Sequence, residues 1–447
     1  MFRRILIANR GEIAVRIIRA CRELGVTSIA VYSSADRDCL HTSIADESIC
    51  IGPAPAAESY LHIPNIIAAA EICDAHAIHP GYGFLAENPK FARICHDCDI
   101  GFIGPTPEVI ALSGDKAACR AAVKAAGVPI VPGSEGRIDD PEKIAALARE
   151  IGFPVLIKAA AGGGGKGMRI AHNEVALKSA IAMAAIEAET AFGDNGLYLE
   201  KFLENARHIE FQILGDNNGK LVSLGERECS IQRRHQKLIE ETPAPGLSGS
   251  LRSRMAKAAL RAAKAIGYTN AGTAEFLLTP DNQFYFIEFN ARIQVEHPIT
   301  EELTGIDLVK EQIRIASGLP LSTPHVRPSG HVIEARIYAE DPQNGFSASP
   351  GKVPRCHLPG GPGIRVDSHL FAGYEVPRFY DSLLAKVIAR GREREEAIDR
   401  LSAALQEFAA DGVKTTARLC TRIVSGDRFR RGDIGPDIID EYVNDSV

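Results

Sequence analysis

The chain has 447 residues, of which 45% are hydrophobic and 24% charged, and its formal net charge at pH 7 is -6. This length predicts about three domains, and the mild acidity gives no electrostatic reason to expect a nucleic acid or an anionic membrane as partner. No apolar run approaches the roughly 18 residues that span a bilayer, so we expect a cytoplasmic protein without a signal peptide. The cysteines are scattered, and the pair Cys95 and Cys98 has no second pair at zinc spacing, which favours reduced thiols over a disulfide framework or a zinc site.

Residues 1 to about 114 alternate apolar strands with helices, a pattern typical of βαβ units around a parallel sheet. The first strand-to-helix turn reads Asn9, Arg10, Gly11 and Glu12 and lacks the GxGxxG fingerprint, so NAD binding is not supported. A later strand-to-helix turn, HPGYGFLAEN, carries Tyr82 between two glycines. By itself this is an ordinary turn.

A second region begins after Gly114. Asp115 is the expected N-cap of the helix KAACRAAVKAA, which places Lys116 in the first helical turn. A cation is unfavourable there because the N-terminal end of the helix dipole is positive. Two interpretations stay open: Lys116 has a phosphate partner, or it is a solvated lysine.

The most glycine-rich segment is FPVLIKAAAGGGGKGMRIA, residues 153–171. Consecutive glycines let backbone N–H groups approach phosphate oxygens, but the Walker spacing is absent, and a strand-like MRIA follows where a Rossmann loop would open a helix. We therefore predict a hairpin lid over a nucleotide, with Lys158 reaching the phosphates. A disordered surface loop is the alternative, which the apolar flanks disfavour.

The strongest local pattern is a predicted β-hairpin. Its strands read TAEFLLT and FYFIEFN, and the turn between them reads PDNQ. A two-residue and a four-residue loop give the same register, in which Glu275 faces Glu288 and Leu277 faces Phe286. Strict alternation also puts Phe286 on the same face as Glu288.

Two carboxylates facing each other across a ladder destabilise a sheet unless a cation lies between them. Glu275, Glu288 and Asn290 offer oxygen ligands of the kind that Mg²⁺ and Mn²⁺ prefer. The alternative is an exposed hairpin edge with solvated glutamates. Four aromatic residues in the same strand favour burial and therefore the metal site.

After the hairpin, IEFNARIQVEHPITE closely resembles the signature of biotin carboxylases, the ATP-grasp enzymes that carboxylate biotin with bicarbonate. NRGEIA, HPGYGFLAEN and RRHQK match the same family pattern, so the resemblance covers essentially the whole chain. It implies an α/β and α+β protein with an ATP-grasp fold. The expected domains are an N-terminal Rossmann-like domain (1–114), an ATP-grasp domain (115–329) with a lid at about 130–203, and a β-rich C-terminal domain (330–447).

The resemblance also implies the site residues. It assigns the nucleotide to Lys116, Lys158, Gly162, Gly163, Gly164, Gly165, Lys166, Gly167, Met168, Glu200, Lys201, Leu203, His208, Gln232, His235, Glu275 and Glu288. It assigns bicarbonate and biotin to Tyr82, Lys237, Arg292, Gln294, Val295, Glu296 and Arg336. Within that set Lys237, Arg292, Glu296 and Arg336 are the expected catalytic residues, with Glu296 as general base. Mg²⁺ or Mn²⁺ is expected on Glu275, Glu288 and Asn290.

In the implied reaction, ATP phosphorylates bicarbonate, and the resulting carboxyphosphate delivers its carboxyl group to biotin. The implied partners are a separate biotin carboxyl carrier protein, carboxyltransferase subunits and a second copy of the chain. No Met-Lys-Met sequence of the kind that carries biotin is present, and nothing follows the C-terminal domain, so we expect a component enzyme. It would catalyse the first half-reaction of acetyl-CoA carboxylase or of a related carboxylase such as pyruvate or 2-oxoglutarate carboxylase, and the final acceptor stays open.

Two other functions compete with this interpretation. Another ATP-grasp ligase, of the carbamoyl phosphate type, would use a similar pocket, but HPGYGFLAEN and RIQVEHPITE favour the carboxylase. A non-catalytic nucleotide-binding regulator is expected to lose the metal carboxylates, and this sequence retains Glu275 and Glu288.

Overall fold

The structure is a computed structural model that describes residues 1–138, 140–159, 168–192, 196–234, 236–322, 328–435 and 437–444. Its N-terminal part is a five-stranded parallel sheet in the order β3-β2-β1-β4-β5, which confirms the predicted βαβ series. The strands are β1 (Arg4–Ile7), β2 (Thr27–Ser33), β3 (Glu47–Gly52), β4 (Ala77–His79) and β5 (Gly101–Phe102). The helices are α1 (Gly11–Glu23), α2 (Leu40–Ile44), α3 (Ile63–Ile72) and α4 (Pro89–Asp97). Buried residues of β1 pack on both faces of this sheet, as parallel sheets require.

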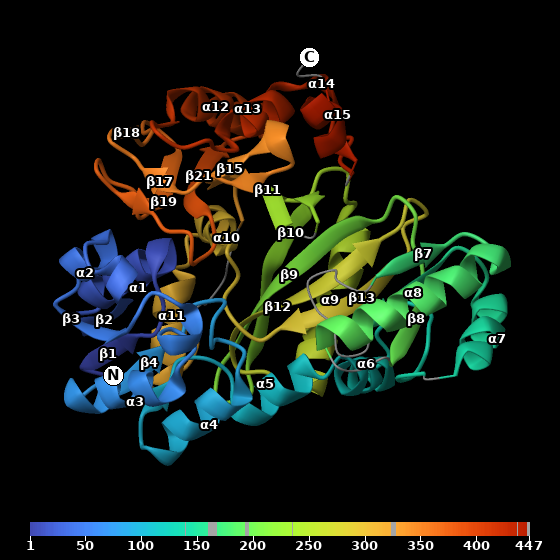
Figure 1. Ribbon diagram of the computed structural model, residues 1–447, viewed down its shortest axis with the longest axis horizontal. Helices are drawn as coiled ribbons and strands as arrows, with labels where there is room; N and C mark the ends of the chain where they lie inside the picture. Colours follow the sequence, from blue (N-terminus) through green and yellow to red (C-terminus); the bar gives the residue numbers. More distant parts are fainter. Residues whose placement is uncertain are drawn as a thin grey trace.

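Two helices lead from this sheet to the predicted lid. They are α5 (Pro107–Gly114) and α6 (Lys116–Ala125), and the Asp115 side chain caps α6 by accepting a hydrogen bond from the Ala118 N–H. The lid contains α7 (Pro141–Ile151), β6 (Val155–Ala159), β7 (Arg169–Ala171), α8 (Glu174–Phe192) and β8 (Leu197–Lys201). Its strands form an antiparallel sheet in the order β7-β6-β8, with a small core of its own. In Figure 1 this unit lies at one end of the molecule.

An eight-stranded antiparallel sheet forms the centre of the molecule, in the order β13-β12-β9-β10-β11-β14-β21-β19. Its strands are β9 (Arg207–Gly215), β10 (Leu221–Arg233), β11 (Gln236–Thr242), β12 (Asn270–Leu278), β13 (Phe284–Asn290), β14 (His331–Tyr338), β19 (Ile364–Ser368) and β21 (Leu383–Gly391). Because β11 pairs directly with β14, the expected ATP-grasp and C-terminal regions share one sheet. Residues from both regions therefore lie side by side.

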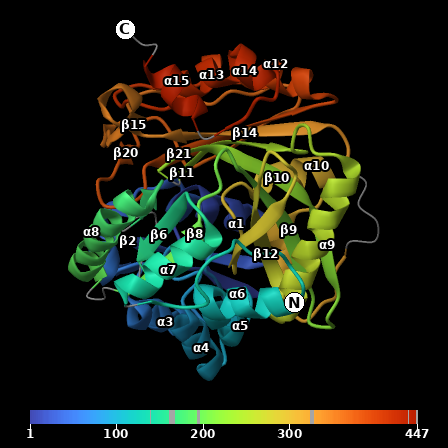
Figure 2. The ribbon, with the colours of Figure 1, turned by 90° about the vertical axis from the view of Figure 1, so that its right-hand side faces the viewer.

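Helices cover the two faces of this sheet. They are α9 (Gly249–Ala265), α10 (His297–Thr304), α11 (Leu308–Ala316), α12 (Arg394–Glu407), α13 (Ala417–Ser425), α14 (Asp427–Arg430) and α15 (Ile438–Asn444). Figure 2 shows α12 to α15 stacked above β14 and β21. Along β14, Ile333 and Ala335 face the core that contains α12 and α13, whereas Val332 packs with Ile299 and Leu303 of α10. Alternation thus turns Glu334 toward α10.

The remaining elements are short. They are β15 (Glu340–Asp341), β16 (Ser347–Ala348), β17 (Gly351–Lys352), β18 (Cys356–His357), β20 (Glu375–Val376), β22 (Ala409–Ala410) and the 3-10 turns at Ser34–Asp36, Ala56–Glu58 and Pro342–Asn344. All ten cysteines are free thiols. In the part of the chain that the structure describes, no helix combines the length and the apolar character needed to cross a membrane.

The hairpin of β12 and β13 forms as predicted in one respect and differs in another. Glu275 does face Glu288, but the register shifts next to this pair, so that Phe276 faces Phe286, whereas Leu277 was expected there. The β-bulge leaves an extra residue on β13, and side chains before and after it change faces. Phe286 consequently packs in the core with Phe289, and the prediction that it shares a face with Glu288 is wrong.

Candidate active site

A buried lysine lies at the centre of the site. Lys237 on β11 places its Nζ 2.5 Å from Glu210 Oε2, 2.5 Å from Glu296 Oε1 and 3.5 Å from Glu275 Oε1. Burial lowers the pKa of Lys237, but the neighbouring Cys229 and Glu210 raise it well above its ordinary value. The ammonium group is therefore charged, and an anion that enters here meets a cation already surrounded by carboxylates.

Arg336 on β14 is the second cation of this cluster. Its Nη2 lies 2.8 Å from Glu296 Oε2 and 2.5 Å from Glu240 Oε1. Glu296 is fully buried, which alone would raise its pKa, but Lys237 and Arg336 lower that pKa well below its ordinary value. Glu296 is thus held ionised between two cations, the charge state that a proton acceptor needs.

Two residues of the cluster were missed at the sequence level. Arg227 has no exposed surface, and its Nε contacts Glu210 Oε1 at 2.6 Å while the rest of its guanidinium reaches Gln212, Thr273 and Thr300. Glu210 therefore joins Arg227 to Lys237. The sequence offered one signal for Glu210: it lies on β9 two residues after His208, so the two side chains share a face of the strand.

The loop between β13 and α10 brings the predicted bicarbonate residues together. Arg292 Nη1 donates to Gln294 Oε1 at 3.0 Å, and Lys386 Nζ donates to the Val295 carbonyl oxygen at 2.9 Å. Arg292 Nε also pairs with Glu87 Oε2 at 2.9 Å. Sequence reasoning missed Glu87 and Lys386 because both come from distant parts of the chain.

The N-terminal sheet reaches the same loop through a second buried contact. The Tyr82 hydroxyl donates to Glu12, and Glu12 Oε1 lies 3.0 Å from Lys386 Nζ. Lys386 is completely buried and bonds the Val295 carbonyl. Tyr82 is thus connected to the site by two charged groups from two different regions.

The predicted metal ligands also lie together. Asn290 Nδ2 donates to Glu275 Oε1 at 2.7 Å, and Glu275 faces Glu288 across the hairpin. Lys116 Nζ is 3.6 Å from Glu288 Oε2, and His208 Nε2 is 3.0 Å from Glu275 Oε2. Burial and the charge of Glu275 raise the pKa of Glu288. A divalent cation between Glu275 and Glu288 would offset both the burial of Glu288 and the repulsion between the two carboxylates, so the donor set fits Mg²⁺ or Mn²⁺.

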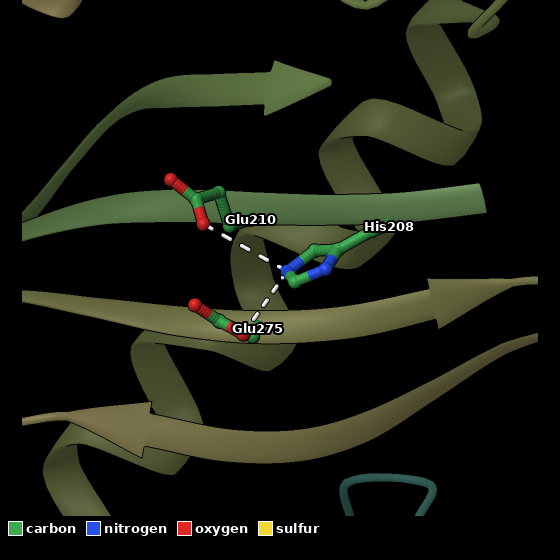
Figure 3. Close-up of side chains that lie close together, drawn as sticks. All are labelled: His208, Glu210 and Glu275. Atoms are coloured by element: carbon green, nitrogen blue, oxygen red, sulfur yellow. Dashed lines mark ion pairs between the residues drawn. The ribbon is translucent and has the colours of Figure 1, made fainter. Parts of the chain in front are cut away.

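A neighbouring group could also be mistaken for a metal site. Figure 3 shows His208, Glu210 and Glu275, whose nitrogen and oxygen atoms lie within 4.8 Å of one another. Glu210 already pairs with Lys237 at 2.5 Å, and Glu275 pairs with His208 at 3.0 Å. Because side-chain cations balance both carboxylates, we assign no metal to this group.

A third set of predicted residues lies in the lid. Lys158 on β6 and Arg120 on α6 both pair with Glu200 on β8, the latter at 2.6 Å. Burial raises the pKa of Glu200, but Lys158 and Arg120 lower it below its ordinary value. Lys201 Nζ donates to the backbone carbonyls of Gly152 and Phe153 at 3.0 and 2.7 Å. The two lysines thus differ: Lys158 is a charge partner of Glu200, whereas Lys201 connects β8 to the segment between α7 and β6.

Three predicted nucleotide residues, Met168, Leu203 and Gln232, are half-buried. Gln232 faces Lys237 across the pairing of β10 and β11. The predictions for Gly162, Gly163, Gly164, Gly165, Lys166, Gly167 and His235 lie outside the described residues.

Three family models match the chain in succession. The one described as "Biotin carboxylase, N-terminal domain" matches residues 1–110. "Carbamoyl-phosphate synthase L chain, ATP binding domain" matches residues 115–324, and "Biotin carboxylase C-terminal domain" matches residues 334–441. The middle model is named after carbamoyl-phosphate synthase, whereas the two that flank it both name biotin carboxylase.

Curated relatives match over almost their whole length. A biotin carboxylase of Nostoc sp. is 53% identical over 442 residues, which cover 98% of this chain and 99% of the relative. A pyruvate carboxylase subunit of Methanothermobacter thermautotrophicus is 51% identical over 444 residues, which cover 99% of this chain and 90% of that one.

Solved structures agree in fold. The complex of a Campylobacter jejuni biotin carboxylase with beta-gamma-ATP superposes with a TM-score of 0.95 at 47% identity, covering 99% of both chains. The biotin carboxylase domain dimer of Hydrogenobacter thermophilus 2-oxoglutarate carboxylase, which holds MgADP, ADP and bicarbonate, superposes with a TM-score of 0.94 at 48% identity, covering 99% of this chain and 98% of that one.

Proposed function

Because the chain belongs to the biotin carboxylase family, we propose that bicarbonate is activated and biotin is carboxylated at the buried charge cluster around Lys237. The protein is an ATP-dependent ligase that carboxylates biotin with bicarbonate. The observation that carries the assignment of the site is the position of Glu296, which lies 2.5 Å from Lys237 and 2.8 Å from Arg336. Between these two cations, the Glu296 carboxylate can deprotonate bicarbonate while Lys237 and Arg336 bind the anionic reactants.

The nucleotide belongs on the side of the lid. ATP would contact Lys116, Lys158 and Glu200 on β8. The match to a complex with beta-gamma-ATP supports this assignment. Lys158 pairs with Glu200, and a bound phosphate would replace Glu200 as the anionic partner of this lysine. Phosphoryl transfer depends mainly on such positioning and charge neutralisation.

Glu275, Glu288 and Asn290 would hold Mg²⁺ or Mn²⁺. The bound cation would neutralise charge on the ATP phosphates. Burial and the charge of Glu275 raise the pKa of Glu288, and its partner Lys116 is as far away as 3.6 Å, whereas Glu275 pairs with His208 at 3.0 Å; a cation at Glu288 would complete the charge balance.

Bicarbonate would be bound by Lys237, Arg292, Gln294 and the backbone at Val295. Glu296 removes the bicarbonate proton, the bicarbonate oxygen attacks the γ-phosphorus of ATP, and ADP leaves with the electrons of the broken P–O bond. A bound bicarbonate also draws Lys237 away from Glu296. That loss of a cationic neighbour would raise the pKa of Glu296 and make it a stronger base.

Biotin would enter beside Arg336 and Tyr82. Carboxyphosphate breaks down to CO₂ and phosphate, the phosphate takes the ureido proton, and the biotin nitrogen attacks CO₂. Arg336 or Arg292 would stabilise the negative charge on the ureido oxygen before that bond forms. The ion pair of Arg336 with Glu296 links this second step to the first.

We also propose the wider setting. The acceptor is biotin on a separate carrier protein, carboxyltransferase subunits use the product, and the enzyme forms a homodimer as in the Hydrogenobacter structure. The ten free cysteines support a cytoplasmic location. The proposed domains are 1–114, 115–329 and 330–447, supported by family models that change near the same residues.

Labelled bicarbonate tests this function. With ATP and Mg²⁺, purified protein should cleave ATP faster when biotin is added and should form labelled carboxybiotin, faster still on a biotinylated carrier because remote contacts position the ureido ring. Lys237→Met should abolish the product, whereas Lys220→Met, at an exposed lysine, should not. Absence of biotin-stimulated ATP cleavage would overturn the proposal.

A further inference from the structure

Two glutamates without a role in the proposed reaction face each other in the large sheet, next to Arg336. Glu240 on β11 and Glu334 on β14 are directly opposite in the antiparallel register, and both are completely buried. Directly opposed residues have Cβ atoms about 5 Å apart, so side chains as long as glutamate can bring their carboxyl groups together. Two buried ionised carboxylates at this separation repel strongly unless cations compensate both.

Among the residues that the structure describes, an ion pair forms with only one of them. Arg336 Nη2 lies 2.5 Å from Glu240 Oε1. The oxygens of Glu334, like those of Glu240, have no hydrogen-bond partner among the described residues. Arg336 Nη2 also lies 2.8 Å from Glu296 Oε2, so its guanidinium is already shared between Glu240 and Glu296.

The other titratable groups around the pair form contacts with other residues or carry no positive charge. On β21, Lys386 Nζ is 3.0 Å from Glu12 Oε1 and bonds the Val295 carbonyl oxygen. On α10, which packs on this face of β14, burial and Lys386 keep the pKa of His297 well below its ordinary value, so its ring is neutral. Glu301, also on α10, adds no positive charge because it is itself an acid.

We propose that Glu240 and Glu334 share one proton in the folded enzyme, so that the pair carries a single negative charge and positions Arg336. The proton gives Glu334 a donor that Glu240 can accept, which satisfies otherwise orphaned buried oxygens. Burial and the charge of Glu240 raise the pKa of Glu334 well above its ordinary value, and burial raises the pKa of Glu240 to about 7, in agreement with one retained proton.

The single charge has a consequence for the reaction. Arg336 lies between Glu240 and Glu296, so the charge on the pair sets how strongly the guanidinium is held away from Glu296. Glu240 is the positioning residue because it acts through Arg336, and Glu334 holds the proton that limits the pair to one charge. This inference rests on the proposed role of Arg336 at the biotin end of the site.

Infrared spectroscopy tests the shared proton without any activity measurement. Protein labelled with ¹³C-glutamate should have a band of a protonated carboxyl group at pH 7 that Glu334→Gln removes. Glu302→Gln on α10, at a half-buried glutamate outside the cluster, should leave the band in place. A spectrum from which Glu334→Gln removes no such band would overturn the proposal, whatever the function of the protein.

Kinetics test the positioning role. Glu334→Gln replaces a neutral acid with a neutral amide and should fold, keep activity within about twofold and keep the pH profile of biotin carboxylation. Glu240→Gln removes the charge and should lower biotin carboxylation about tenfold or more while lowering biotin-independent ATP cleavage much less. Misfolding or severe inactivation of Glu334→Gln, or equal losses of both activities in Glu240→Gln, would contradict the proposal.

Discussion

The charge cluster and the lid hold their functional residues in opposite ways. In the cluster, side chains of Lys237, Glu210 and Glu296 are 11%, 0% and 0% exposed, and each forms an ion pair with a residue from another part of the chain. On the nucleotide side, Lys116 is 59% exposed and Lys158 28% exposed. The lid also has a core separate from that of the large sheet.

This difference indicates a division of work. Preorganised charges in a water-excluded site stabilise developing charge without further reorganisation, which suits the chemical steps. Lysines that are more exposed, on the lid and on the adjoining helix α6, can bind and release a nucleotide with little disturbance of the rest. Changes in the cluster should therefore affect turnover most, and changes on the nucleotide side should affect ligand and metal affinity.

The largest effect is expected for Glu296→Gln. The amide cannot accept the bicarbonate proton and leaves Lys237 and Arg336 without their shared carboxylate, so turnover should fall about 10²- to 10⁴-fold. Steady-state carboxylation and equilibrium binding of an ATP analogue measure the two sides separately. Glu302→Gln on α10 is the matched control. A large loss of ATP affinity with unchanged turnover would break the comparison between cluster and lid.

Glu288→Gln should affect the metal first. Even groups that only support metal ligands contribute about 10- to 100-fold to affinity or activity, so loss of an anionic ligand should lower ATP cleavage by about 100-fold. Titration with Mn²⁺ should give a weaker dissociation constant, and excess metal should restore part of the rate. Asp281→Asn on the hairpin turn should leave both values unchanged. Unaltered Mn²⁺ affinity in Glu288→Gln would remove Glu288 from the metal site.

Glu241→Gln tests the scaffold behind the cluster. Glu241 is buried and pairs with His331 at 2.6 Å and with Arg394 at 2.8 Å. Loss of one partner of such a buried pair costs about 3 kcal/mol, which should lower the thermal midpoint at pH 7 by about 5 °C. Exposed Glu393 provides the control substitution.

The same variant has a defined pH dependence. Burial raises the pKa of Glu241, but hydrogen bonds from His331 and Arg394 lower it below its ordinary value of 4.5. Because the folded-state pKa is depressed, the stabilisation is present above about pH 4.5 and is lost as the pH falls through the folded-state value. The difference between the melting curves of parent and variant should therefore shrink below pH 4.5. A difference that grows on acidification would contradict this assignment.

The smallest effect concerns the lid. An ATP analogue should slow amide hydrogen exchange in β6 and β8, which carry Lys158 and Glu200, because the bound phosphates order side chains on these strands. Exchange in β9 and β12 of the central sheet should change little. Equal protection of both sheets would show that the cluster is also reorganised when the nucleotide binds.

The local hairpin was predictable and its fine geometry was not. The turn PDNQ and the alternating strands were sufficient to place Glu275 opposite Glu288. The β-bulge moved Phe286 into the core with Phe289, because aromatic packing against distant helices outweighs strict alternation. The short-range pattern thus predicted the carboxylate pair correctly but assigned Phe286 to the wrong face of the strand.

By itself, the sequence predicted the order of the main strands and helices, the facing carboxylates Glu275 and Glu288 and the motifs that identify the family. Only the tertiary structure decided the charge partners: Glu87 pairs with Arg292 across 205 positions, and Lys386 reaches the carbonyl of Val295 across 91. The physical reason is that a side chain's charge state depends on whichever groups share its buried surroundings. Here those groups come from loops and strands that lie together in the fold and far apart in the chain.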